Sequence, residues 1–106
     1  MVYELRIYTC KPGAVERVLT LWEQEGKAML DLYFKMAGQW TTISGITNRI
    51  YTLWEFTDLN HREEARKQLL LHPGFDAYLA RCRDLYVEQE AIFLNPTTLS
   101  LMPGNR

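Results

Sequence analysis

The chain has 106 residues, 47% of them hydrophobic, and a formal net charge of -1 at pH 7. This length predicts one domain over residues 1–106, and the apolar content excludes an intrinsically disordered chain. The near-neutral charge lacks the excess of positive charge that binds nucleic acid or anionic lipid. No apolar run is long enough to span a membrane. The N-terminus has neither an apolar signal core nor an arginine-rich transit helix, so a cytoplasmic location is the default expectation.

Residues that usually hold metals or carry covalent chemistry are few in this sequence. Cys10 and Cys82 lack the spacing of a disulfide framework and are expected to be free thiols. His61 and His72 match no metal-site pattern. The chain also lacks a phosphate-binding loop and a recognisable Ser-His-Asp or Cys-His arrangement. No metal, nucleotide or other cofactor is therefore expected.

The first element is a strand that runs into a Lys-Pro-Gly turn, together covering residues 3–13. Because side chains alternate along a strand, two groups form: Leu5 and Ile7 on one face, and Glu4, Arg6 and Tyr8 on the other. We expect Leu5 and Ile7 to pack on the core. The polar face has two interpretations, a solvated surface or the lining of a semi-polar cavity.

A long helix is expected next, because apolar residues between Val15 and Tyr33 recur at intervals of three, four and seven. Gly26 interrupts this stripe and indicates a bend or the close approach of another segment. The helix is expected to end at residues 37–38. A strand should follow over residues 39–44, with Trp40 and Thr42 on one face.

The clearest later strand covers residues 49–56, with Ile50, Thr52, Trp54 and Phe56 on one face and Tyr51, Leu53 and Glu55 on the other. Large apolar side chains on both faces indicate that both faces are covered. Asp58 is a good N-cap for a second helix, in which Ala65 and Leu69 are apolar and Arg62 is expected on the solvated face. A helix from Phe75 and a strand over 87–95 follow, and 103–106 form a loose tail.

This order of elements predicts a ferredoxin-like α+β fold, βαββαβ, with a four-stranded antiparallel sheet and helices on one face. The helix-free face of such a sheet cannot simply be wet here, because the apolar residues of the 49–56 strand would be exposed on it. A homodimer in which the two sheets face each other would cover that face. Curved sheets would then enclose a cavity.

Four segments resemble the NIPSNAP family in their order along the chain: residues 3–9 followed by Lys-Pro-Gly, residues 38–42, residues 48–56, and Glu90 ahead of residues 92–96. The resemblance covers nearly the whole chain and implies the dimeric α/β-barrel superfamily. That superfamily includes cofactor-free monooxygenases, polyketide cyclases, haem-handling proteins and ligand binders, so the fold does not fix a function. Many family members carry a histidine where this chain has Thr52.

The candidate site follows from the expected orientation of the strands. With Leu5 and Ile7 on the helices, a cavity between the sheets of a dimer would be lined by Glu4, Arg6 and Tyr8. The resemblance adds Asn48, Thr52 and Trp54 and puts Tyr51 and Leu53 on the helices, while Trp40 and Thr42 would join from the second strand and Glu88 or Glu90 from the last.

Such a cavity could hold a small molecule. Arg6 could bind a carboxylate or phenolate by paired hydrogen bonds, Glu4 or Glu90 could act as a general base, and Tyr8 could donate to an enolate-like oxygen. Alternatively, Arg6 only pairs with Glu90 across the sheet.

Two functions therefore stay open. In the first, this NIPSNAP-like protein is a binder, or alternatively a small enzyme, that takes a small apolar or aromatic metabolite without metal or nucleotide. In the second, it is a non-catalytic protein-interaction module. The first predicts a cavity that holds Arg6 and Trp54, and the second predicts that this space is filled.

Overall fold

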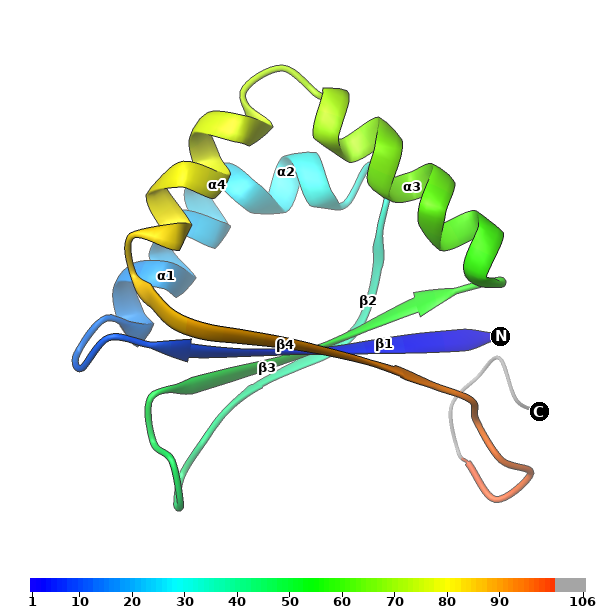
Figure 1. Cartoon of the computed structure of the whole chain (residues 1–106), viewed down its shortest axis with the longest axis horizontal. Coiled ribbons are helices and arrows are strands. Elements are labelled where there is room, and N and C mark those ends of the chain that lie inside the picture. Colours follow the sequence, from blue (N-terminus) through cyan, green and yellow to red (C-terminus); the bar gives the residue numbers. More distant parts are fainter. Residues whose placement is uncertain (101–106) are drawn as a thin grey trace.

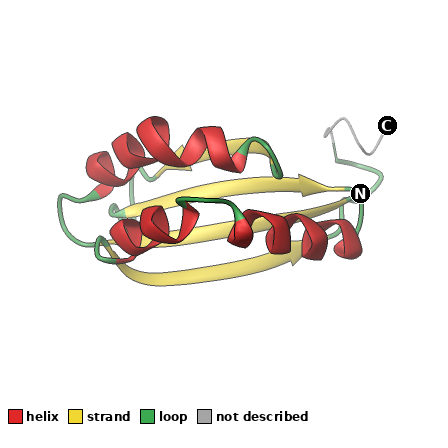
Figure 2. Ribbon diagram, turned by 90° about the horizontal axis from the view of Figure 1, so that it is seen from above, coloured by secondary structure: helices red, strands yellow, loops and turns green. Residues whose placement is uncertain are grey.

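The computed structural model describes residues 1–100, and in it four antiparallel strands form one sheet in the order β2-β3-β1-β4. Helices cover one face of this sheet in two rows (Figures 1 and 2). The elements in chain order are β1 (Val2–Cys10), α1 (Val15–Leu21), η1 (Trp22–Gly26), α2 (Lys27–Leu30), β2 (Lys35–Thr41), β3 (Arg49–Phe56), α3 (Leu59–Leu71), α4 (Phe75–Arg83) and β4 (Tyr86–Leu94). The predicted ferredoxin-like α+β fold is confirmed. The expected tail over 103–106 lies outside the described residues.

Strand β1 lies at the centre of the sheet and pairs with both β3 and β4. Arg6, in its middle, lies opposite Thr52 on one side and Ala91 on the other. Thr52 in turn lies opposite Gln39 on β2. Side chains in one such cross-strand row point to the same face.

The faces of β1 are the reverse of those we expected from the sequence. Val2 packs with Ala65 of α3, and Cys10 packs with Val18 of α1, so the even-numbered residues of β1 face the helices. Leu5 and Ile7 lie half-buried on the helix-free face. The reason is that the two ends of the even-numbered row, Val2 and Cys10, are apolar, and that Glu4 between them finds Arg62 on α3 as a partner.

Strand β3 is reversed in the same way. Trp54 and Phe56 pack against Phe34 with ring centroids 5.3 and 5.2 Å apart, on the helix side of the sheet. Tyr51 and Leu53 lie opposite Ile7 and Leu5 and so share the helix-free face, not the helix face. Apolar residues therefore do occupy both faces of β3, as the sequence indicates.

The segment from Val15 to Leu30 is one helical run with a π-helical turn, η1, at its centre. Gly26 ends this turn and is buried. A Cβ atom placed on Gly26 would lie 2.3 Å from Cζ of Tyr78 on α4. The interruption of the apolar stripe at Gly26 thus marks a close approach between two helices.

The first helical run ends earlier than expected, at Leu30 instead of residues 37–38, and β2 begins at Lys35. Pairing with β3 decides this, because Met36 lies opposite Trp54 in the sheet. A bulge between Met36 and Gly38 shifts the register, and the Trp40 ring lies over Gly38, where a Cβ would come within 2.4 Å of the ring. Tertiary contacts therefore override the helical pattern of this stretch.

Helix α3 begins as the sequence predicts. The Asp58 side chain caps it by accepting a hydrogen bond from the backbone N–H of His61 at 2.7 Å. Within residues 1–100, no helix has the length and apolar character needed to cross a bilayer.

Candidate functional site

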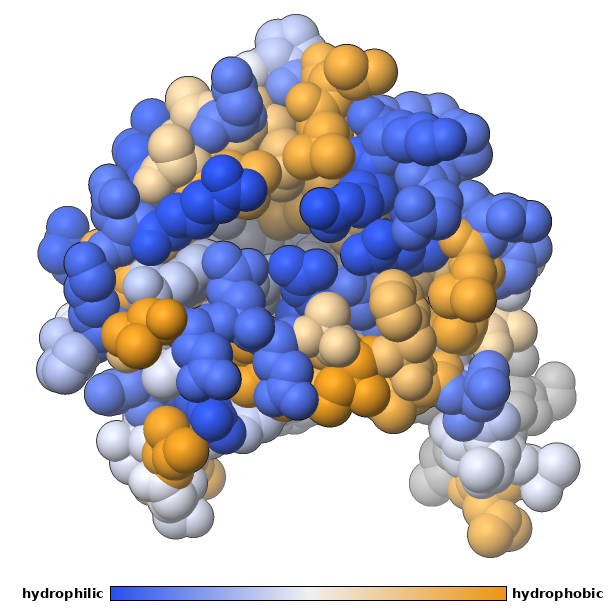
Figure 3. Space-filling model, in the orientation of Figure 1, coloured by the Kyte–Doolittle hydropathy of each residue, from blue (hydrophilic) through white to orange (hydrophobic). Residues whose placement is uncertain are grey.

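A cavity of about 240 Å³ lies between the sheet and the helices of the chain. Figure 3 shows the molecule hollowed there, with hydrophilic residues around the opening. Its apolar wall combines aliphatic residues with the aromatic side chains of Tyr8, Trp22, Phe34, Trp54, Phe75, Tyr78 and Tyr86. This cavity lies inside a single chain, whereas the cavity that we predicted lies between the sheets of a dimer and stays a prediction.

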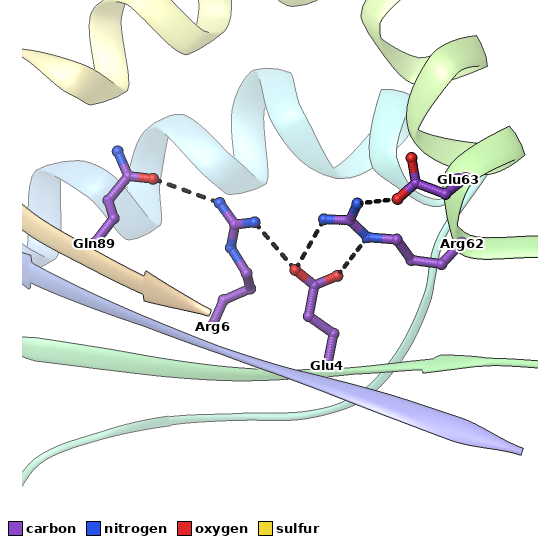
Figure 4. Close-up of polar contacts among 5 residues, drawn as sticks. All are labelled: Glu4, Arg6, Arg62, Glu63 and Gln89. Atoms are coloured by element: carbon purple, nitrogen blue, oxygen red, sulfur yellow. Dashed lines mark hydrogen bonds and ion pairs between the residues drawn. The ribbon is translucent and has the colours of Figure 1, made fainter. Parts of the chain in front are cut away.

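The polar centre of this cavity is the Glu4 carboxylate, which is only 1% exposed. Arg62 of α3 donates to both of its oxygens, from Nε at 3.1 Å and from Nη2 at 3.2 Å. Arg6 donates from Nη1 to Oε2 at 3.1 Å (Figure 4). Two guanidinium groups therefore hold one buried carboxylate, which satisfies the charge that burial would otherwise penalise.

Arg62, which pairs with both oxygens of Glu4, was predicted to lie on the solvated face of its helix, and that prediction was wrong. Its side chain is 11% exposed and lies over the Phe93 ring, 5.2 Å from the centroid. The signal that could have found it is its spacing, because Arg62 comes three residues before Ala65 and seven before Leu69, the two buried residues of α3.

Arg6 has unused hydrogen-bonding capacity. The one hydrogen bond of its Nη2 within residues 1–100 is a long one, 3.5 Å, to the amide oxygen of Gln89, and the guanidinium lies over the Tyr8 ring, 5.7 Å from its centroid. Its Nε is buried and has no acceptor among residues 1–100. Burial by itself would lower the pKa of this guanidinium, but the neighbouring Tyr8 and Glu4 outweigh burial and raise it, so Arg6 stays charged.

The tyrosine hydroxyls of the cavity stay protonated. Burial raises the pKa of Tyr8, and the positive charge of Arg6 opposes that rise without cancelling it. Burial also raises the pKa values of Tyr78 and Tyr86. Tyr8 and Tyr86 stack with ring centroids 4.7 Å apart. These groups can therefore donate hydrogen bonds to a ligand but are not poised to lose a proton.

Five of the residues that the sequence proposed for a ligand site do line this cavity: Glu4, Arg6, Tyr8, Thr52 and Trp54. They come together because even-numbered positions of β1 and β3 share the helix face of the sheet. Gln39 of β2 joins them by donating to the Thr52 hydroxyl at 3.2 Å. Whether any of them contacts a ligand stays a prediction.

The other four proposed residues lie elsewhere. Trp40 lies opposite Tyr51, and Glu90 lies opposite Ile7, so both belong to the helix-free face. The Thr42 hydroxyl donates to the backbone oxygen of Ile46 within the β2–β3 loop. Asn48 accepts a backbone hydrogen bond from Cys10 at the end of that loop. Pairing of Arg6 with Glu90 is excluded, because the two side chains point to opposite faces of the sheet.

The arrangement limits the chemistry open to the cavity. Both oxygens of Glu4 already accept from guanidinium groups, so Glu4 is not free to take a proton from a substrate. Cys10 and Cys82 are free and buried, and burial raises the pKa of each thiol, which disfavours the nucleophilic thiolate. Within the described residues, no three His, Cys, Asp or Glu side chains are grouped to hold a metal ion.

Comparisons with known proteins agree on one family. The NIPSNAP family model matches residues 3–101. The structure is similar to that of an uncharacterised NIPSNAP domain protein from Burkholderia xenovorans, with 30% identity, a TM-score of 0.91, and coverage of 94% of this chain and 98% of the other. It is also similar to a NIPSNAP family protein of unknown function from Agrobacterium tumefaciens, with 30% identity, a TM-score of 0.89, and coverage of 95% and 92%.

A more distant structural likeness extends to a putative antibiotic biosynthesis monooxygenase from Bacteroides thetaiotaomicron, with 20% identity, a TM-score of 0.70, and coverage of 97% of this chain and 91% of the other. At this identity the likeness concerns the fold alone. No curated protein matches the chain.

Proposed function

We propose a function for this chain, which belongs to the NIPSNAP family, from the geometry of the cavity that it contains. Family membership alone does not supply one, because the Agrobacterium tumefaciens relative is itself described as having unknown function. The protein binds a compact apolar or aromatic metabolite between its sheet and its helices, without a metal or nucleotide.

The observation that supports this proposal is an aromatic cavity with a charged hydrogen-bonding group in its wall. A volume of about 240 Å³ lies just below the range of about 300–1,000 Å³ that is usual for drug-sized ligands, so it suits a single ring with a short substituent. Trp54 and Tyr8 offer flat apolar surfaces, and Arg6 offers donors beside them. An interaction module would need no such space.

Binding of a ligand is better supported than acid–base catalysis as the role of this cavity. Among residues 1–100, the one carboxylate that lines the cavity is that of Glu4, which two arginines already hold. The cavity hydroxyls have raised pKa values and act as neutral donors.

Nuclear magnetic resonance can test the proposal, because the three tryptophan indole N–H signals sample different places. Trp22 and Trp54 line the cavity, while Trp40 lies on the helix-free face and serves as an internal control. Titration with a panel of one-ring compounds should shift the Trp22 and Trp54 signals and leave Trp40 unchanged. If no compound moves the cavity signals, or if all three move alike, the proposed function is wrong.

A variant that fills the cavity sharpens the test. Thr52→Phe adds a ring at the floor of the cavity, and it should abolish the shifts of Trp22 and Trp54. Its far-ultraviolet circular dichroism and thermal melt show whether the fold is kept. The exposed Thr20→Phe substitution, outside the lining of this cavity, is the matched control and should bind as the wild type does.

A further inference from the structure

The guanidinium of Arg6 has one edge free to receive a planar anion. Nε and Nη2 form one side of a guanidinium, and a carboxylate binds side-on to these two donors through two parallel hydrogen bonds. In this chain Nη1 is committed to Glu4, Nε has no acceptor among residues 1–100, and Nη2 has only the 3.5 Å contact to Gln89. A buried N–H without an acceptor is destabilising, so an incoming acceptor is favoured there.

Gln89 is the side chain that such an anion would replace. It is exposed on β4 and lines the cavity, and its amide oxygen points at Arg6 (Figure 4). A neutral amide at 3.5 Å is a weak partner for a guanidinium. A carboxylate is a stronger one, because its negative charge is attracted to the guanidinium and its two oxygens can accept two parallel hydrogen bonds from it.

The charge of the cavity points the same way. Three arginines and one glutamate line it, a net charge of +2 in a chain whose net charge is -1. Two of these arginines, Arg66 of α3 and Arg83 of α4, are exposed and make no ion pair within residues 1–100. They supply positive potential where solvent meets the cavity, which attracts an anion toward it.

A second buried donor lines the same cavity. The Trp22 indole Nε1 has no acceptor among the described residues, and Trp22 lines the cavity. Trp22 belongs to the π-helical turn η1 and Arg6 to strand β1, so the two donors come from the helix side and the sheet side of the cavity.

We propose that the ligand of this cavity is a small aromatic or alicyclic monocarboxylate, whose carboxylate binds the Nε–Nη2 edge of Arg6 in place of the Gln89 amide. This inference rests on the proposed function and names the class of ligand that the cavity prefers. The ring lies among the aromatic residues of the wall.

The experiment compares matched pairs of one-ring probes by isothermal titration calorimetry and by the indole signals described above. The pairs are benzoate with benzamide, and phenylacetate with phenylacetamide, which differ in charge and hardly in shape. The acids should bind at least about tenfold more tightly than the amides, a difference expected from one charge-assisted pair. Their affinity should fall with added salt.

Gln89→Glu provides the sharpest variant, because it places a carboxylate of the chain itself in front of Arg6. It should remove the preference for acids, and it should not weaken the fold. The control Gln24→Glu adds the same charge at an exposed position outside the cavity lining and should bind as the wild type does. Gln89→Ala, which removes the competing amide oxygen, should bind the acids at least as tightly as the wild type.

The outcomes separate the two proposals. Equal affinity for acids and amides overturns the carboxylate inference and leaves the binding function standing. Tight binding of acids by Gln89→Glu also overturns it, since the Arg6 edge would then not be the site. Failure of acids, amides and unsubstituted rings alike to move the Trp22 and Trp54 signals overturns the binding function itself.

Discussion

Arg62 on helix α3 holds both carboxylate oxygens of Glu4 on strand β1, 58 positions away in the chain. The contact ties the helix layer to the central strand of the sheet, and both side chains are largely withdrawn from solvent. A buried ion pair of this kind contributes little over an apolar pair, but it is costly to break on one side only.

Arg62→Ala should destabilise the fold by about 3 kcal/mol, because it leaves the buried Glu4 carboxylate with Arg6 as its remaining partner. Urea unfolding followed by circular dichroism measures this change. Glu63→Ala is the control, since it removes the other, 60% exposed partner of the same arginine, and it should change the free energy of unfolding by less than about 1 kcal/mol. Equal stability of the two variants would show that the Glu4 pair does not hold the layers together.

Gly26→Ala should destabilise the chain by about 1–3 kcal/mol through overpacking, because the added methyl group would meet the Tyr78 ring. Thermal melts of the single and double variants measure it. Tyr78→Leu removes the end of the ring, so its effect and that of Gly26→Ala should be less than additive when combined. Additive effects would mean that the two residues are not in contact.

We propose that a second copy of the chain covers the helix-free face of the sheet. Trp40 is 55% exposed there, beside Leu53 and Ile7, which are half-buried. Sedimentation at micromolar concentration should report a homodimer, and Leu53→Glu should convert it to a monomer. Leu71→Glu places the same charge at an exposed position of α3 and should leave the dimer intact. A wild-type chain that sediments as a monomer would contradict this proposal.

Acid should weaken the fold through Glu55. Lys35, 2.8 Å away, lowers the pKa of this carboxyl, and the Tyr3 hydroxyl, which donates to it at 3.1 Å, lowers it further. Because the folded-state pKa is depressed, the stabilisation is fully present above the ordinary glutamate value of about 4.3 and is lost as the pH falls through the lower folded value.

The measurement is urea unfolding of wild type and Lys35→Met between pH 7 and pH 3. The variant should lose less stability over this interval than the wild type. Parallel pH profiles would mean that Lys35 does not act on Glu55.

The sequence predicts the elements of this fold well and the orientation of its first strand wrongly. Alternation in β1 and β3 separates the two faces correctly, but it carries no information on which face meets the helices. Charge on Glu4 and Arg6 suggested the face away from the helices. The structure reverses this because Arg62, on α3, brings the compensating charge into the interior.

The candidate site was therefore only partly within reach of the sequence. Glu4, Arg6 and Thr52 share a face by strand periodicity alone, so their grouping could be predicted. Trp40 and Glu90 do lie on the helix-free face, where the sequence put them, but Glu4, Arg6 and Thr52 lie on the opposite face, so the two groups do not meet. Which residues of different strands share a face depends on strand pairing and bulges, which one sequence does not reveal. Arg62 and Trp22 belong to helices, and their inward direction depends on how those helices sit on the sheet.

The π-helical turn at Trp22–Gly26 has a consequence for how related chains can differ. A π turn contains one residue more than an α turn. The side chains of the α-helical segments on either side keep their direction relative to the sheet. A single residue can therefore be lost within this turn while Val18 before it and Leu30 after it still point toward the sheet. The cavity wall at Trp22 is thus a place within the helix layer where the length of the chain can change without turning the flanking segments away from the sheet.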